Sequence, residues 1–211
     1  IIGSKGIHWN DYIAPFSVQE VKYNRINFND PLFIMFSSGT TGLPKCIVHS
    51  AGGTLLQHLK EHQLQSDIKA NDRLMYFTTC GWMMWNWMVS GLASGATLVL
   101  FDGSPFYPDG NRLANIVADE KVTHFGTSAK YLDACAKNNI IPINKYDLSS
   151  LRTIFSTGSP LSETGFDYVY KNWKEDVCLS SIAGGTDILG CFVGGSPISP
   201  VYSCLLYTSP S

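Results

Sequence analysis

The chain has 211 residues, 45% of them hydrophobic, which is enough to bury a sizeable core in one or two domains. Its formal net charge of −2 does not indicate binding to nucleic acid or to an anionic membrane. The six cysteines are scattered without a Cys-x-x-Cys pair, which argues against a zinc site or a disulfide framework and favours a reducing compartment such as the cytoplasm.

Short apolar runs alternate with amphipathic segments from residue 32 onward. Strands are predicted at 32–36, 46–49, 74–79, 97–101, 122–126, 152–156 and 178–183. Helices are predicted at 52–65, 82–93, 111–120, 128–138 and 162–173, with start signals at Ser50, Ser128 and Ser162. This alternation predicts an α/β fold, in which a mostly parallel β-sheet is flanked by helices. No linker divides the chain, so we expect a single core.

Residues 74–101 contain no charged side chain, which raises the alternative of a membrane-spanning helix. Polar residues and glycines interrupt the run, at Thr78, Thr79, Gly81, Asn86, Ser90, Gly91, Ser94 and Gly95. The segment is therefore predicted to be a buried strand–helix–strand unit of the α/β core.

The nine residues between the first two predicted strands have the composition of a phosphate-binding loop. They read Ser37-Ser38-Gly39-Thr40-Thr41-Gly42-Leu43-Pro44-Lys45. The glycines let the backbone approach an anion, the four hydroxyls can donate to phosphate oxygens, and the lysine adds a positive charge. The loop is not a Walker A loop, because Pro44 separates Gly42 from Lys45 and Cys46 follows the lysine. The alternative is a Ser- and Gly-rich surface turn.

Three further motifs accompany this loop. They are Gly81-Trp82 within residues 79–87, the stretch Ser156-Thr157-Gly158-Ser159-Pro160-Leu161, and the stretch Ser181-Ile182-Ala183-Gly184-Gly185-Thr186-Asp187-Ile188. Together with the loop, they resemble the signature motifs of adenylate-forming enzymes, the superfamily of acyl-CoA synthetases, luciferases and adenylation domains of peptide synthetases. Residues 50–62 and 101–105 resemble the acetoacetyl-CoA synthetase branch of that superfamily.

The resemblance covers residues 8 to 202 and implies part of the large N-terminal domain of such an enzyme, with residues 1–203 forming a partial AMP-binding domain. It implies a ligase that converts acetoacetate, ATP and CoA to acetoacetyl-CoA, AMP and pyrophosphate through an acyl-adenylate, with Mg²⁺ as the metal. Its partners would be these small molecules, with neither nucleic acid nor membrane. By the same resemblance the ribose-binding aspartate, the hinge and the C-terminal lysine lie outside the chain, so we expect the segment alone to be inactive.

The resemblance also implies roles for individual residues. The β- and γ-phosphates would be held by Ser37, Ser38, Gly39, Thr40, Thr41, Gly42 and Lys45. Gly158, Ser159 and Pro160 would line the adenine side, and Gly185 and Thr186 would contact the α-phosphate, with Lys45 and Thr186 as the catalytic groups. Thr41 and Asp187 would lie near Mg²⁺. The superfamily more often has glutamate at position 187, and the alternative for Asp187 is a helix-cap or turn carboxylate.

The same resemblance places Gly81, Trp82 and Gly184 in the acyl pocket. Acetate-activating relatives have a tryptophan two positions before the motif's threonine, where this chain has Gly184. We expect the smaller residue to make room for acetoacetate; the alternative is that Gly184 is glycine for backbone reasons. Most other Met and Trp residues of 82–88 are interpreted as core packing.

The histidines carry little signal by themselves. His58 and His62 stand one helical turn apart and could hold a metal, but no third ligand is evident, so solvated or hydrogen-bonded histidines are the favoured interpretation. His49 is placed at the end of a buried strand.

Two other functions remain open at this point. One is another short-chain acyl-CoA synthetase, using acetate or a longer acid; the ratio of kcat/KM for the two acids discriminates it. The other is a non-catalytic, nucleotide-binding fragment, which a turnover assay on the complete gene would separate from an enzyme.

The last eight residues, 204–211, do not continue the resemblance and read like the translation of a sequencing-library adapter. We predict that these codons are absent from the genuine gene. Sequencing across the junction in source DNA measures this directly. Genomic codons that run from Val201 and Tyr202 into the same Cys-Leu-Leu-Tyr string would contradict the prediction.

Overall fold

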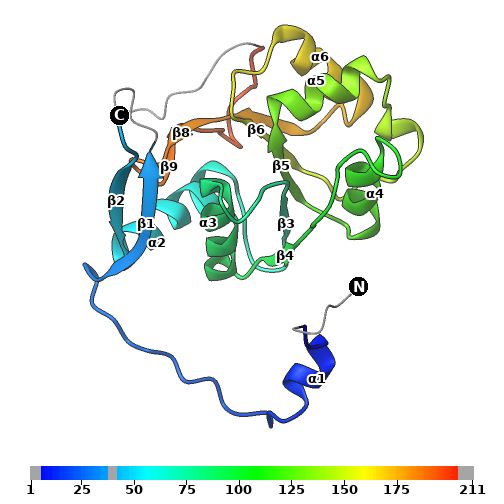
Figure 1. Cartoon of the computed structure of the whole chain (residues 1–211). Coiled ribbons are helices and arrows are strands. Elements are labelled where there is room, and N and C mark those ends of the chain that lie inside the picture. The colour runs from blue at the N-terminus through cyan, green and yellow to red at the C-terminus, as the bar shows by residue number, and fades with distance from the viewer. Residues whose placement is uncertain (1–5, 38–41, 204–211) are drawn as a thin grey trace.

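The computed structural model describes residues 6–37 and 42–203. Its centre is a five-stranded parallel sheet in the spatial order β4-β3-β5-β6-β7. The strands are β3 (Arg73–Tyr76), β4 (Thr97–Val99), β5 (His124–Ser128), β6 (Thr153–Thr157) and β7 (Cys178–Ser181). The predicted α/β class and the mostly parallel sheet are confirmed (Figure 1).

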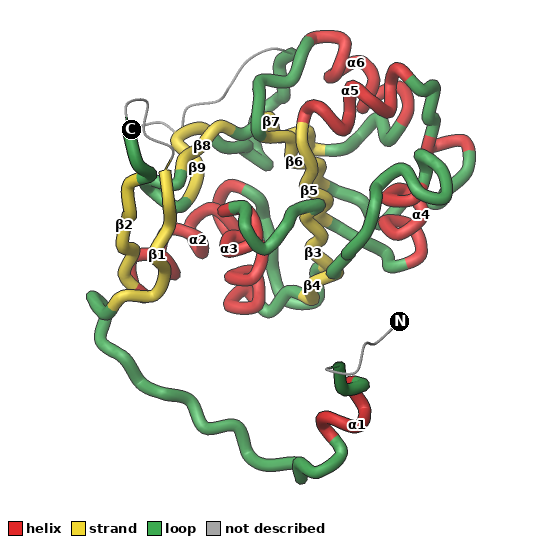
Figure 2. Tube along the Cα trace, in the orientation of Figure 1, coloured by secondary structure: helices red, strands yellow, loops and turns green. Residues whose placement is uncertain are grey.

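Helices cover both faces of this sheet (Figures 1 and 2). On one face lie α4 (Arg112–Asp119), α5 (Ala129–Lys137) and α6 (Glu163–Asn172), packed on Met75, Phe125 and Ile154. On the other face lie α2 (Ala51–Leu59) and α3 (Met83–Val89), and α3 packs on Tyr76 and Phe155. The two sets of sheet residues alternate along the strands, because successive side chains of a strand point to opposite faces. Both faces are buried, which explains the apolar runs in the sequence.

The three predicted N-caps are confirmed. Ser50 Oγ accepts a hydrogen bond from the Gly53 amide at 3.3 Å, Ser128 Oγ from Tyr131 at 3.2 Å, and Ser162 Oγ from Gly165 at 3.1 Å. Each bond satisfies an amide that the first helical turn leaves without a backbone partner. These caps begin α2, α5 and α6 within one residue of the predicted starts.

The first two predicted strands exist but do not join the parallel sheet. β1 (Pro31–Ser37) and β2 (Lys45–Ser50) pair with each other as an antiparallel hairpin. Phe33 and Met35 on one face of the hairpin pack against the cluster around α3, whereas Ile34 and Phe36 on the other face are exposed. The hairpin is therefore fixed to the core by one apolar face only.

Several boundaries differ from the sequence prediction. The expected strand 178–183 is divided into β7 and β8 (Ala183–Gly185), and β8 turns away to pair with β9 (Gly190–Val193), a strand that was not predicted. The region of the expected helix 52–65 contains α2, which ends at Leu59, and then a π-helical segment, Lys60–Gln65. The expected helix 82–93 becomes α3 followed by a 3-10 segment, Ser90–Ser94. Short α1 (Trp9–Ile13), also not predicted, lies on an exposed arm, residues 6–29, ahead of the hairpin (Figure 1).

Residues 74–101 form β3, α3, the 3-10 segment and β4, as predicted. Within the described ranges, no helix is both long and apolar enough to cross a membrane.

Buried histidines make the folded state sensitive to acid. Burial lowers the pKa of His62 to about 3 and that of His124 to about 4, both well below the usual 6.5. An unfolded chain therefore takes up protons on these groups below pH 6.5, whereas the folded chain does so only near pH 3 to 4. Their contribution to stability is fully present above pH 6.5 and is lost as the pH falls toward 4.

We predict that the denaturant concentration at the unfolding midpoint decreases when the pH is lowered from 7 to 4.5. In His62→Phe this decrease should be smaller. The phenylalanine ring preserves the edge contact with Trp87, whose ring centroid lies 4.2 Å from that of His62, and cannot bind a proton. Denaturant unfolding at several pH values measures the effect, and His8→Phe on the exposed arm is the control. Equal pH dependence in wild type and His62→Phe would contradict the prediction.

Candidate functional site

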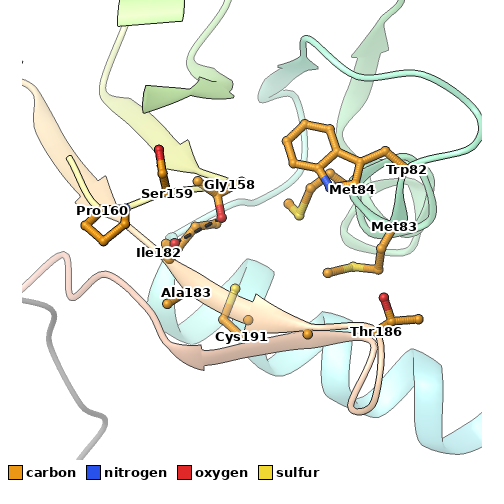
Figure 3. A pocket seen from close by; sticks show the side chains of 13 residues that line it. Trp82, Met83, Met84, Gly158, Ser159, Pro160, Ile182, Ala183, Thr186 and Cys191 are labelled. Carbon is orange, nitrogen blue, oxygen red and sulfur yellow. Dashed lines mark hydrogen bonds between the residues drawn. The ribbon is translucent and has the colours of Figure 1, made fainter. Parts of the chain in front are cut away.

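A cavity of about 330 Å³ opens where three segments of the chain meet. Its lining comes from the start of α3, from the loop after β6, and from the β8–β9 hairpin. The lining residues are Trp82, Met83, Met84, Thr157, Gly158, Ser159, Pro160, Ile182, Ala183, Gly184, Gly185, Thr186 and Cys191. Figure 3 shows Trp82, Met83 and Met84 facing the hairpin across the cavity, with residues 158–160 at one end.

The parallel pairing of β6 with β7 determines this location. Both strands end at the same edge of the sheet, and the chain leaves β6 through Gly158 and β7 through Ile182. The Ile182 amide donates to the Ser156 carbonyl at 2.8 Å, and Thr157 Oγ1 donates to the Ile182 carbonyl at 3.0 Å. Ligands of open α/β sheets bind at this carboxyl edge. Gly158 has φ of +87°, a conformation that favours glycine, and it turns the loop along the cavity.

The opposite wall is apolar. Trp82 is the residue at which α3 begins, and its ring packs edge-on against the buried Tyr76, with 5.9 Å between centroids. Met83 and Met84 are buried in the first turn of α3. The predicted role of the methionines as packing residues is thus correct, and they also line the cavity.

Thr186 and Asp187 lie in the turn between β8 and β9. The Thr186 side chain lines the cavity, and its carbonyl accepts a hydrogen bond from His49 Nε2 at 2.8 Å. Asp187 is exposed beside the cavity rather than in its lining. Across residues 6–37 and 42–203, no group of three or more His, Cys, Asp or Glu side chains could hold a metal ion. One exposed carboxylate suits Mg²⁺ that keeps most of its waters and binds substrate phosphates.

The predicted phosphate loop spans the tip of the β1–β2 hairpin. Ser37 is the last residue of β1 and pairs with Lys45, the first residue of β2, which is exposed. Ser38, Gly39, Thr40 and Thr41 lie outside the described residues. Around Gly42 there is open space, since a Cβ there would meet no heavy atom within 4 Å. β2 continues to His49, which contacts Thr186, so the strand that carries Lys45 also reaches the cavity turn.

The family model for AMP-binding enzymes matches residues 6–200 of the chain. The chain belongs to this family.

Curated relatives within the AMP-binding family show a more specific similarity. The chain is 59% identical over 197 residues to acetoacetyl-coenzyme A synthetase of Rhizobium meliloti, a match that covers 93% of this chain and 30% of the relative. Identity to acetoacetyl-CoA synthetase of Gallus gallus is 52% over 183 residues, covering 87% of this chain and 27% of the relative. The chain thus spans less than a third of the length of the curated relatives it matches.

The same similarity holds for the fold. The structure of acetoacetyl-CoA synthetase from Streptomyces lividans superposes with a TM-score of 0.84 at 43% identity, covering 89% of this chain and 29% of that one. The five-stranded sheet and its helices are therefore those of a segment of an AMP-binding enzyme.

The cavity brings together some of the site residues expected from the sequence. Trp82, the stretch 158–160 and the stretch 184–186 line it. Gly81 is exposed outside the lining, and the described part of the phosphate loop does not line it either. Sequence reasoning missed Cys191, because it did not predict β9; the apolar stretch 191–193 after the 185–189 turn was the available signal.

The backbone around Gly184 bears on why this position is glycine. This glycine does line the cavity, but a Cβ there would lie 2.1 Å from the Gly190 carbonyl oxygen and 3.0 Å from Cys191 Cα. A side chain would therefore collide with the backbone of β9 before it could fill the pocket. This close approach supports the alternative, that residue 184 is glycine for backbone reasons, and the role of Gly184 in the acyl pocket stays a prediction.

We predict that Gly184→Ala destabilises the protein by about 1–3 kcal/mol, because neither backbone strand can move without breaking the hairpin. Gly81→Ala is the matched control, since its Cβ would find its nearest atom 4.0 Å away, at Thr79 Oγ1. Thermal unfolding of both variants measures the difference. A Gly184→Ala variant as stable as Gly81→Ala would contradict it.

Proposed function

We propose that the chain is part of an acetoacetate–CoA ligase and contributes residues that bind ATP and the acid during formation of the acyl-adenylate. The observation that carries this proposal is the single cavity in which α3, the loop after β6 and the β8–β9 hairpin meet. Relatives at 50–59% identity that are named acetoacetyl-CoA synthetase support the choice of reaction.

The proposed reaction has two steps. A carboxylate oxygen of the acid attacks the α-phosphorus of ATP, and pyrophosphate leaves. The thiolate of CoA then attacks the acyl carbonyl carbon, and AMP leaves. The first step brings two anions together, so positioning and charge stabilisation supply most of the rate.

Each part of the site has a task in the first step. The loop after β6 and Gly158 bind one face of the adenine, and the Thr186 hydroxyl donates to the α-phosphate. Lys45 and the hydroxyls of residues 37–41 hold the β- and γ-phosphates, where a lysine acts as a point charge. Mg²⁺, when bound near Asp187, neutralises charge that builds up on the phosphate oxygens.

The acid lies against the apolar wall in this proposal. Trp82, Met83 and Met84 exclude water from the carbon chain of a short acid, and Trp82 Nε1–H is a donor for a keto oxygen. In this proposal the apolar wall contributes to the discrimination between acetoacetate and acetate.

A reducing compartment, and hence the cytoplasm, suits the proposed enzyme. Cys46, Cys80, Cys135, Cys178 and Cys191 are all free thiols. Disulfides would form and persist in an oxidising compartment, so five free thiols support this assignment.

We predict that Lys45→Ala and Thr41→Ala, in the full-length protein, each lower acetoacetate-dependent pyrophosphate exchange by on the order of 10²–10³. Lys171→Ala is the matched control, because Lys171 is an exposed helix lysine paired with Asp167 at 3.1 Å and does not line the cavity. Wild-type exchange in both loop variants would remove their phosphate role. Exchange driven better by acetate than by acetoacetate in the unmodified protein would overturn the proposed substrate.

A further inference from the structure

One short stretch of chain holds the β8–β9 hairpin at three successive points. His49 lies near the end of β2, His58 lies on α2, and Glu61 lies on the π-helical segment that follows. Their side chains contact Thr186, Leu189 and Cys191, which are 130 to 137 residues away in sequence. We call these three side chains the hairpin anchors.

The first anchor acts on a site residue itself. His49 Nε2 donates to the carbonyl of Thr186 at 2.8 Å, and this contact fixes the proton on Nε2 because a carbonyl can only accept. Thr186 is the residue that lines the cavity and would face the α-phosphate. The bond thus joins the strand that begins with Lys45 to the turn that carries Thr186.

The second anchor holds the end of the same turn. His58 is fully buried, and its Nε2 donates to the Leu189 carbonyl at 2.7 Å, while Nδ1 lies 2.8 Å from Ser90 Oγ. Burial lowers the pKa of His58, so the ring is neutral, and Nδ1 accepts from the serine hydroxyl. The 3-10 segment after α3 is thereby connected to the hairpin.

The third anchor joins the two walls of the cavity. The side chain of Glu61 is only 3% exposed. Its Oε1 accepts from the Cys191 amide at 2.7 Å and from Gln57 Nε2 at 2.7 Å, and its Oε2 accepts from Trp87 Nε1 at 2.8 Å. Cys191 belongs to the hairpin wall, whereas Trp87 belongs to α3, the helix that begins the apolar wall.

The backbone around Glu61 is adapted to this contact. The segment Lys60–Gln65 is π-helical, a form that occurs mostly as short insertions and often at functional sites. A Cβ at residue 190 would lie 2.6 Å from Glu61 Oε1 and 2.7 Å from Gln57 Nε2, so a side chain there would displace these groups from β9.

We propose that His49, His58 and Glu61 are positioning residues of the adenylation site, which hold Thr186 and set the separation of the cavity walls. This inference rests on the proposed function. A displacement of about 1 Å at a reacting group can cost on the order of 10²-fold in rate, so bonds to the turn itself have kinetic consequences. The two histidines, which the sequence analysis set aside, thus serve the site through hydrogen bonds.

The decisive variant is His49→Ala in the full-length protein. We expect kcat for acetoacetate-dependent pyrophosphate exchange to fall by on the order of 10- to 100-fold, with a small change in KM for ATP. His49→Gln should restore most of the loss, because its amide nitrogen can donate at the position of Nε2. His124→Ala is the matched control: His124 Nε2 contacts the Ser66 carbonyl at 2.9 Å, away from the cavity.

The control separates positioning from stability. His124→Ala should lower the melting temperature while leaving kcat per folded enzyme unchanged. An unchanged kcat in His49→Ala, an equal loss in His49→Gln, or an equal loss in His124→Ala would each overturn the role of His49.

Glu61→Gln tests the third anchor. Every neighbour of the carboxylate named above donates a hydrogen bond. The NH₂ group of glutamine is also a donor, so the hydrogen bond to either Cys191 or Trp87 would be lost. We expect KM for acetoacetate to rise more than KM for ATP, because the walls of the acid pocket shift. A folded variant in which both KM values keep their wild-type ratio would overturn the role of Glu61.

Hydrogen exchange gives a measurement that does not depend on turnover. In Glu61→Ala, the peptide that contains the Cys191 amide should exchange faster than in wild type, because that amide loses its acceptor. Unchanged protection overturns the proposal. If wild type shows no acetoacetate-dependent exchange of pyrophosphate, the proposed function fails, and faster hydrogen exchange in Glu61→Ala still supports the anchors.

Discussion

The site depends on one constraint, the parallel pairing of β6 with β7. Parallel strands end at the same edge of a sheet, so the loop after Thr157 and the chain after Ser181 must leave side by side. The bond from Thr157 Oγ1 to the Ile182 carbonyl then joins the two exits at 3.0 Å. The cavity is the space between these exits and the start of α3.

The sheet can impose this arrangement because both of its faces are buried. Phe125 and Ile154 are fully buried under α4–α6, and Phe155 is buried under α3. Close-packed interiors resist movement, so packing holds the ends of the strands in place. The β8–β9 hairpin lies outside the five-stranded sheet. Leu189 and Cys191 pack on the apolar cluster around α3, and polar side chains from β2, α2 and the π-helical segment also hold the hairpin.

Local sequence signals predicted the regular elements well. Ser50, Ser128 and Ser162 cap helices as expected, because capping needs only neighbouring amides. The errors lie where long-range pairing decides. The antiparallel partner of β8 was missed, and 178–183 was predicted as one strand, because whether Ala183 continues in the sheet depends on a partner chosen in three dimensions.

By itself, the sequence determined the fold class, the family signature and the segments that form the cavity, because these depend on short motifs and on hydrophobic periodicity. Only the tertiary structure decided what each side chain does there. Gly184 lines the cavity, and a Cβ there would also meet the backbone of β9. His49 and His58 carried little signal in the sequence, yet they contact Thr186 and Leu189. The reason is physical. The roles of these side chains depend on contacts with residues more than 130 positions away, which a local sequence pattern cannot predict.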